Sequence, residues 1–388
     1  MKNKIYIIAQ TESILTKRGN RHPNIADYLV NNGSTIIYYT SNFYHSEKRF
    51  FKETEILEAK KKVKYNLKVL KTLGYYNNIA PRRVINNFLF SLLVFIKLVF
   101  IVQKQDKVFL PSRPVELIFF MSLLKRIKGV RIYLDIQDIW PDALEIKNKF
   151  KKKIFEIYCN IFLKPSLKYY DNSLVVAPSF EKWLRRYAKH VPAVFVPLGW
   201  ENDRWLDVDR KVPIDNSIVK IVCVAQLQHQ IDIMPILEVL KDYKKYHLTI
   251  IGEDGKGDRY AEVIKYIEKN LISNVDIIGK VTRGEMKNHL EFMSIGILPM
   301  LTTSIPNKIF DYMACELPII VLGENDSSHF VVQNEIGWSC DYNSNSLLML
   351  LENITEVSIS NKISKLKLIK CNYSRNHLHK EIKAALNI

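Results

Sequence analysis

The sequence predicts an α/β fold with two Rossmann-like domains. Short apolar runs rich in Ile, Val, Tyr and Phe alternate with longer runs of helical periodicity through residues 1–199, and the same alternation returns in residues 218–370. Strands that alternate with helices form parallel βαβ units, so each series predicts a doubly wound sheet. The chain of 388 residues is also long for one core, and the polar stretch 200–217 is the expected linker.

In the first domain, each predicted strand is an apolar run bounded by turn residues, and Gly33 closes the first helix because glycine readily takes a left-handed conformation. The charged region 44–63 is expected to be irregular or helical. The predicted strands are 4–9, 34–40, 107–111, 131–136, 173–177 and 193–198. The predicted helices are 23–33, 86–103, 117–128, one from Lys151 onward, and 180–190.

The second domain repeats this rhythm. Its predicted strands are 218–225, 247–252, 275–279, 294–300, 318–323 and 337–342. Its predicted helices are 232–243, 260–270, 283–293, a short one opened by the Pro-Asn-Lys step at 306–308, and one between 323 and 337. Helices follow from Ser344, and we expect residues 371–388 to cross back onto the first domain.

Composition and charge indicate a globular protein with an anionic partner. Lys and Arg number 57 against 40 Asp and Glu, a formal net charge of +17. Such an excess attracts nucleic acid, an anionic membrane surface or phosphorylated substrates. Nucleic acid is not expected, because the sequence lacks zinc-ligand spacing, an RNP-like strand and a basic recognition helix. A solvated basic surface is the alternative.

The cysteine pattern and the N-terminal residues predict a cytoplasmic location. Five cysteines occur without a CxxC pair, which is typical of buried thiols in a reducing compartment. The N-terminal apolar run is too short for a signal peptide. The apolar segment 86–103, interrupted by Lys97 and preceded by Arg82 and Arg83, is either an interfacial membrane helix or a helix buried against a sheet.

Five motifs carry a resemblance to a known family. "GKVTRGEM" (279–286), "SIGILPM" (294–300), "SIPNKIFDYMACELPIIV" (304–321) and "EIGWSC" (335–340) together resemble the nucleotide-sugar domain of retaining glycosyltransferase family four. "QDIWPDAL" (137–144) looks like the acceptor-side domain of its bacterial O-antigen and capsule branch. The resemblance implies the GT-B fold, in which two Rossmann-like domains face a cleft and ligands lie at the carboxyl ends of both sheets.

The strip that begins at Ser304 predicts a donor site. A helix that starts at Ser304 or Pro306 presents free backbone amides and the positive end of its dipole to a diphosphate. Lys308 adds a positive charge for the same phosphates, and Asp311, one turn on, can accept hydrogen bonds from ribose hydroxyls. A surface ion pair is the alternative. The strip also includes Thr303, Ile305 and Asn307.

The strip departs from the family pattern. Where the family has two glutamates, this chain has Thr303 and Asp311, and the usual Arg and Lys of the diphosphate clamp are replaced by Gln226 and Ile231. Lys308 is therefore the clearest phosphate cation and is assigned a catalytic role.

Two further groups complete the donor side by resemblance. Backbone groups of Gly279, Lys280 and Val281 are expected to contact the base, with an ordinary strand-to-helix turn as the alternative. Glu316 replaces the glycine that the family has before "LPII".

The loop after the first strand, "TKRGNRHPNIADYL" from Thr16, is expected at the carboxyl end of the first sheet. Gly19 lets the backbone approach a ligand closely. The resemblance implies that Arg18 and Gly19 reach the donor diphosphate, while Arg21 and His22 contact the acceptor. A solvated basic loop is the alternative.

Asp138 and Trp140 are the predicted acceptor-side residues at the end of strand 131–136. Asp138 could orient the acceptor hydroxyl or accept its proton, and Trp140 could stack on sugar or lipid. Asp138 could instead cap the following turn. No metal or other cofactor is expected, because the DxD of Asp207 and Asp209 falls in the linker.

Together these features predict a retaining glycosyltransferase that moves a sugar from a nucleoside diphosphate donor, with UDP favoured. The expected acceptor is a polyprenyl-diphosphate-linked glycan of bacterial surface polysaccharide, which places the protein peripherally on the inner face of the cell membrane. A nucleotide-sugar epimerase and a non-catalytic subunit that stabilises a partner transferase are the alternatives.

Overall fold

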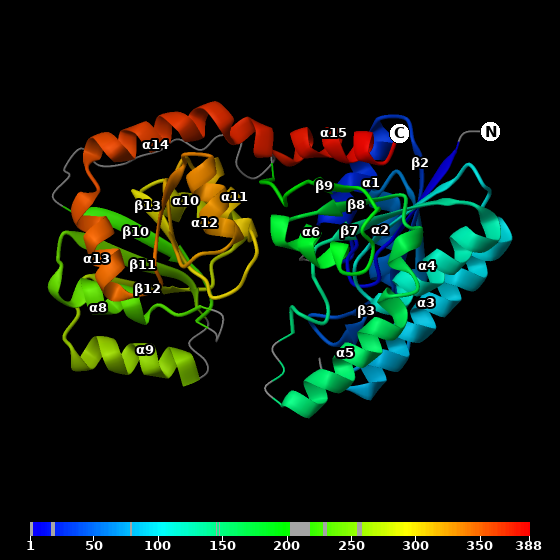
Figure 1. Cartoon of the computed structure of the whole chain (residues 1–388), viewed down its shortest axis with the longest axis horizontal. Helices are drawn as coiled ribbons and strands as arrows, with labels where there is room; N and C mark the ends of the chain where they lie inside the picture. Colours follow the sequence, from blue (N-terminus) through cyan, green and yellow to red (C-terminus); the bar gives the residue numbers. More distant parts are fainter. Residues whose placement is uncertain are drawn as a thin grey trace. The chain divides into compact units, whose positions relative to one another are not determined.

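The computed structural model describes residues 3–16, 20–77, 80–144, 146, 148–201, 218–227, 231–253 and 258–388. It divides into two compact units (Figure 1). Unit 1 comprises Met1–Val196 and His379–Ile388, and unit 2 comprises Pro197–Leu378. Most of the predicted linker, residues 202–217, lies outside the described residues.

Unit 1 is built on a seven-stranded parallel sheet of order β5-β2-β1-β6-β7-β8-β9. Apolar residues of the central strands β1, β6 and β7 are buried, as expected for a parallel sheet covered on both faces. The strands are β1 (Lys4–Ile8), β2 (Thr35–Ser41), β5 (Asn66–Leu70), β6 (Lys107–Pro111), β7 (Arg131–Ile136), β8 (Asn172–Val175) and β9 (Ala193–Phe195).

Region 44–63 holds more structure than predicted. An antiparallel hairpin of β3 (Phe43–Tyr44) and β4 (Arg49–Phe50) begins one residue before this region. Helix α2 (Glu53–Lys62) follows the hairpin. Strand β5 was not predicted either, because its sequence NLKVL keeps only one alternating apolar face. The other helices of unit 1 are α1 (Arg21–Asn31), α3 (Pro81–Ile101), α4 (Val115–Lys128), α5 (Lys149–Leu163) and α6 (Pro178–Arg185), with a 3-10 turn η1 (Leu167–Tyr169).

The end of the chain completes unit 1. Helix α15 (Arg375–Ala385) and the residue that follows it contribute two buried apolar side chains to unit 1, Ile382 and Leu386. Its last turn also bonds to the sheet: Asn172 Nδ2 donates to the Ala385 carbonyl at 3.0 Å, and Lys107 Nζ donates to the Asn387 carbonyl.

Unit 2 is a six-stranded parallel sheet of order β12-β11-β10-β13-β14-β15. Its strands are β10 (Val219–Val224), β11 (Tyr246–Glu253), β12 (Val275–Gly279), β13 (Ile295–Pro299), β14 (Ile319–Leu322) and β15 (Gly337–Cys340). Its helices are α8 (Met234–Asp242), α9 (Asp258–Lys269), α10 (Arg283–Leu290), α11 (Asn307–Ala314), α12 (Asp326–Gln333), α13 (Ser344–Asn353), α14 (Glu356–Ile369) and the 3-10 turn η2 (Lys370–Tyr373). The prediction of an α/β fold with two Rossmann-like domains is confirmed.

Helix α11 is fixed to the sheet of unit 2 by one buried aromatic side chain. The Tyr312 hydroxyl accepts from Val224 N at 2.9 Å and donates to the Val222 carbonyl at 3.2 Å. The ring lies against Gly296, where an added Cβ would come within 2.5 Å of it. The missing side chain of Gly296 thus lets α11 approach the sheet and sets the position of its N-terminus.

Candidate functional site

The N-terminus of α11 differs from the starts of most other helices in unit 2. Pro306 is its N-cap residue, and its side chain accepts no hydrogen bond from the amides of the first turn. The structure describes every residue of that turn. In contrast, side chains accept from first-turn amides in four other helices of this unit: Thr282, Asn325, Asn343 and Thr355. A helix start without such a cap keeps amide donors and a positive partial charge for a ligand.

Lys308 lies in the first turn of α11 and is half-buried. Burial lowers the pKa of its ammonium group, while Cys223 on β10 and Asp311 in the next turn oppose that shift. Burial in turn raises the pKa of Cys223 to about 11. A partly desolvated cation beside free helix amides suits an anionic ligand better than water.

The residues that lead into α11 are partly fixed by contacts and partly accessible to solvent. Ile305 is buried, so only its backbone is available to a ligand. The Ser304 carbonyl accepts a hydrogen bond from Ser327 Oγ on α12. Thr303 and Asn307 are exposed. The strip is therefore held by the buried Ile305 side chain and by α12, while two of its side chains are open to solvent.

The other predicted donor residues lie along the same edge of the sheet. Gln226 follows β10, which neighbours β13, so it lies near the strip. Gly279 and Lys280 are exposed at the end of β12, with Val281 after them, and β11 separates them from β10. Arg18 and Gly19, the remaining predicted donor residues, lie outside the described residues.

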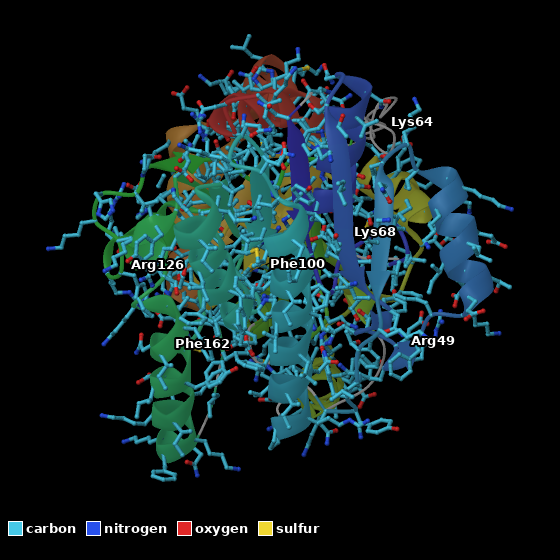
Figure 2. All side chains as sticks on the ribbon, turned by 90° about the vertical axis from the view of Figure 1, so that its right-hand side faces the viewer. Arg49, Lys64, Lys68, Phe100, Arg126 and Phe162 are labelled. Atoms are coloured by element: carbon cyan, nitrogen blue, oxygen red, sulfur yellow. The ribbon has the colours of Figure 1, made fainter. Side chains whose placement is uncertain are left out.

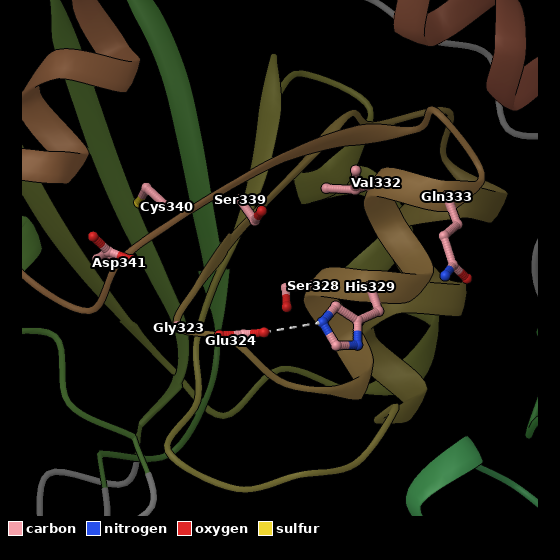
Figure 3. A pocket seen from close by; sticks show the side chains of 9 residues that line it. All are labelled: Gly323, Glu324, Ser328, His329, Val332, Gln333, Ser339, Cys340 and Asp341. Atoms are coloured by element: carbon pink, nitrogen blue, oxygen red, sulfur yellow. Dashed lines mark ion pairs between the residues drawn. The ribbon is translucent and has the colours of Figure 1, made fainter.

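A pocket of about 480 Å³ opens on unit 2 where β14 and β15 end and α12 begins (Figure 3). Its lining contains none of the predicted site residues among those the structure describes. Glu324 and His329 face each other across its mouth, with 3.6 Å between Oε1 and Nε2, and both are exposed. Ser328 lines it while the adjacent Ser327 holds Ser304, so the first turn of α12 lies between this pocket and the strip.

Arg21 and His22 do not belong to an open loop, which corrects the sequence-based placement. Helix α1 begins at Arg21, and both side chains are buried. Arg21 donates to the two oxygens of Asp135 at 2.9 and 3.1 Å and to the Val196 carbonyl. His22 Nδ1 lies 2.7 Å from Glu12 Oε2, and its Nε2 lies 3.2 Å from Asp135 Oδ2.

The charges of this buried group compensate each other. Burial alone would lower the pKa of His22, but Glu12 and Asp135 outweigh it and raise that pKa to about 9. Burial alone would raise the pKa of Asp135, but Arg21 and His22 hold it well below its usual range. Arg21, His22 and Asp135 therefore belong to an internal ion-pair network of unit 1.

Asp138 is the predicted acceptor-side residue that stays accessible. Its carboxylate pairs with Arg113 and is 34% exposed, and its backbone is held by Ser112, whose Oγ donates to the Asp138 carbonyl at 2.7 Å. Burial raises the pKa of Asp138, and Arg113 partly offsets that rise. A carboxylate with a raised pKa at the end of a parallel strand is suited to accept a proton.

Trp140 is not the open stacking surface that the sequence predicted. The side chain is only 6% exposed and packs edge to face on Phe155, with ring centroids 5.3 Å apart. The guanidinium groups of Arg83 and Arg113 lie over its ring. Sequence analysis did not single out Arg113, and it considered Arg83 only as a basic residue that precedes the apolar segment 86–103.

A metal site is absent from the part of the chain that the structure describes, as judged by groups of three or more His, Cys, Asp or Glu side chains. Asp207 and Asp209 lie outside it. The expectation that no cofactor is needed stays a prediction.

Comparison with known proteins supports the fold and the class of enzyme. Residues 219–356 match the family model described as glycosyl transferases group 1. No curated protein sequence matches the chain. The solved structures with a similar fold include Anabaena HepE in complex with UDP, with a TM-score of 0.71, 10% identity and 100% of both chains covered.

Two other similar structures are those of differently named enzymes. Sucrose-phosphate synthase from Thermosynechococcus elongatus has a TM-score of 0.70 at 10% identity, covering 100% of this chain and 98% of that one. The lipopolysaccharide outer core galactosyltransferase WaaB has a TM-score of 0.66 at 12% identity, covering 99% of both. The chain thus has the GT-B fold and carries a glycosyl transferases group 1 domain in unit 2, which confirms the prediction of a glycosyltransferase.

Proposed function

We propose that this glycosyltransferase moves a sugar from a nucleoside diphosphate donor, with UDP as the favoured nucleotide, to a polyprenyl-diphosphate-linked glycan of a bacterial surface polysaccharide. The observation that carries the donor half is the uncapped start of α11 with half-buried Lys308, inside the segment that matches the glycosyltransferase model. The bound UDP of HepE, which shares the fold, supports the choice of nucleotide.

On the donor side, the reaction requires stabilisation of a diphosphate leaving group. Negative charge grows on the oxygen that leaves the sugar, and the first-turn amides of α11 and the Lys308 ammonium are placed to balance it. Asp311 accepts hydrogen bonds from the ribose hydroxyls and holds the nucleotide in register. The family resemblance implies retention of the anomeric configuration, and no side chain is assigned as a covalent nucleophile.

On the acceptor side, Asp138 is the proposed group that orients the attacking hydroxyl and takes its proton. Its raised pKa makes it a better base than an ordinary aspartate, and Arg113 fixes the direction of the carboxylate. Sucrose-phosphate synthase and WaaB share the fold but act in different syntheses, so the acceptor assignment rests on "QDIWPDAL" and on the surface of unit 1.

That surface supports a position on an anionic membrane. Helices α3, α4 and α5 pack as one layer of unit 1, with α4 in contact with both others (Figures 1 and 2). One side of α5 exposes apolar residues at spacings of four, three and four: Phe150, Ile154, Ile157 and Ile161. Basic residues accompany them at Lys149, Lys151, Lys152, Lys153 and Lys164.

Helix α3 adds a second apolar surface to this layer. Its exposed residues include Ile85, Phe88, Ile96 and Phe100, the last of which is 82% exposed. It is the helix of the described chain that is long and apolar enough to span a bilayer, and a third of its apolar window is buried within unit 1. Apolar side chains flanked by lysines are typical of helices that lie in the interface of an anionic bilayer.

A thermal-shift screen against UDP-, GDP- and dTDP-sugars tests the donor half. A ligand that binds only the folded chain raises the melting temperature by mass action, by an amount set by its concentration relative to Kd. We expect the UDP-sugars to raise it most. An absence of response to all three classes would sink the proposed enzyme function.

A further inference from the structure

Five side chains of unit 1 form a cluster around Arg113, the partner of Asp138: Lys48, Tyr75, Arg83, Arg113 and Trp140. They come from five places in the sequence. Lys48 lies in the β3–β4 hairpin, Tyr75 follows β5, Arg83 is in the first turn of α3, and Arg113 and Trp140 follow β6 and β7. We call this the cation–aromatic cluster.

The cluster places positively charged side chains close together over two aromatic rings, those of Tyr75 and Trp140. Lys48 Nζ lies 4.9 Å from the Tyr75 ring centre, and Arg83 Cζ lies 5.5 Å from the same ring. Arg83 and Arg113 in turn share the Trp140 ring, at 5.4 and 5.8 Å. The ring faces attract cations, but cations that share a ring repel each other.

Lys48, Arg83 and Arg113 create a positive potential around their neighbours in the cluster. Asp138 pairs with Arg113, and burial raises the pKa of Glu116, which Tyr158 contacts through its hydroxyl. His45 is neutral, because burial together with Lys48, Arg83 and Arg113 lowers its pKa to about 4.

The cluster is also accessible and correctly placed for a ligand. Tyr75 and Trp140 are buried and form its floor, whereas Arg113 is 44% exposed. Arg113 and Trp140 follow the carboxyl ends of two adjacent strands, the edge where ligands bind in doubly wound sheets. Arg83 lies at the start of the 21-residue helix α3, so the helix dipole adds to the positive potential.

We propose that the cation–aromatic cluster binds the diphosphate of a lipid-linked acceptor. Arg83 and Arg113 offer planar guanidinium groups that match phosphate oxygens, and Lys48 adds a point charge. The exposed apolar residues Ile85 and Phe88 belong to the same helix, α3, which thus offers an apolar surface of unit 1 to a polyprenyl chain. The assignment rests on the proposed function, and the Arg113–Asp138 pair joins the two sites.

The test uses the full chain and farnesyl diphosphate, a short polyprenyl diphosphate, in isothermal titration. We expect Arg83→Gln and Arg113→Gln each to weaken binding by roughly tenfold or more, because each removes charge-assisted hydrogen bonds. Lys61→Gln, an exposed lysine on α2, is the matched control and should bind as the unchanged chain does. Unchanged affinity in both arginine variants, or an equal loss in the control, overturns the site.

Two further ligands identify the source of the phosphate. Farnesol should bind weakly because it lacks the charge, and inorganic pyrophosphate should bind more weakly than farnesyl diphosphate because it lacks the chain. Equal affinity for pyrophosphate overturns the lipid assignment. Since Arg83 is half-buried, Arg83→Lys and a melting curve of each variant separate loss of binding from loss of folding, and exposed Arg113 gives an independent answer.

The donor screen separates this proposal from the proposed function. Intact farnesyl diphosphate binding without any response to nucleotide sugars would count against the transferase and leave the anion site standing. A normal nucleotide-sugar response with no effect of the arginine variants would count against the cluster alone.

Discussion

Glu316 shows how one residue can depart from a family pattern and still be explained. It directly follows the C-cap of α11 with φ of 56°, a left-handed conformation that favours glycine and is strained in other residues. The resemblance places a glycine there. Glu316 Oε1 lies 2.6 Å from Lys370 Nζ, a contact with η2 that glycine could not make.

This geometry predicts the ranking of two variants. Glu316→Gly and Glu316→Ala both lose the contact with Lys370, but only alanine keeps the strain of the left-handed backbone. We expect the glycine variant to have the larger free energy of unfolding, by about 1 kcal/mol, in denaturant titrations of the full chain. Equal stabilities would show that the strain is relieved in another way.

Lys308 carries the donor hypothesis at the residue scale. Lys308→Ala should weaken UDP binding roughly tenfold to a hundredfold in isothermal titration, because it removes a half-buried cation from the phosphate site. Lys265→Ala, an exposed lysine on α9, provides the control for loss of charge alone. The hypothesis fails if both variants bind UDP equally well.

His22 gives unit 1 a stability that depends on pH. Its pKa is raised to about 9 in the folded chain from an ordinary value near 6.5, so its stabilisation is complete below about pH 6.5 and is lost as pH rises through 9. The His22→Gln variant has no titratable group at this position. The melting-temperature difference between the unchanged chain and this variant should therefore shrink between pH 6.5 and 9.5. A constant difference would contradict the raised pKa.

At the scale of elements, helical spacing explains why two predicted acceptor residues are buried. His22 precedes Ile25, Ala26 and Leu29 by three, four and seven positions, so it lies on the apolar face of α1. That signal was present in the sequence but was outweighed by the polar composition of the loop. The partners of His22, Glu12 and Asp135, are distant in sequence and could not be inferred from spacing.

The cation–aromatic cluster could not be predicted for a similar reason. Arg113 and Trp140 end neighbouring strands, which topology alone could bring together, but Lys48 depends on the short β3–β4 hairpin and Tyr75 on β5. Neither the hairpin nor the strand was predicted. Residues on such short elements are placed by tertiary contacts and leave little trace in periodicity.

Helix α5 yields a prediction about its exposed apolar side. Ile157→Glu with Ile161→Glu should lower binding to anionic phospholipid vesicles at least tenfold in flotation assays, because two apolar contacts become negative charges. The matched control places glutamate at Val357 and Leu368, exposed apolar positions on α14. Equal effects of the two double variants, or undiminished binding, would argue against α5 as the membrane surface.

At the scale of the whole molecule, alternating periodicity was sufficient for the main architecture. Both parallel sheets were expected from runs such as KIYIIA and IVKIVCVA, because buried parallel strands are nearly continuous apolar runs. The donor strip followed from local sequence, since Lys308 and Asp311 share one helix face. Site residues that depend on several distant segments did not follow.

The intact chain should release its nucleotide only when an acceptor is present. With a UDP-sugar and a polyprenyl-diphosphate-linked glycan, we expect free UDP to accumulate, and we expect none without the glycan. Acceptor-independent release with an epimerised sugar would favour the epimerase alternative. Unchanged polysaccharide synthesis in cells carrying Lys308→Ala or Asp311→Ala would favour the non-catalytic subunit.

The assignment of His379–Ile388 to unit 1 has a consequence for biosynthesis. Asn172 and Lys107 bond to carbonyls near the very end of the chain, and Tyr28 packs on His379 with ring centroids 5.3 Å apart. Although domains usually fold in order during translation, unit 1 cannot complete these contacts until residues 379–388 have left the ribosome. Unit 2 is continuous in sequence and can therefore finish folding first.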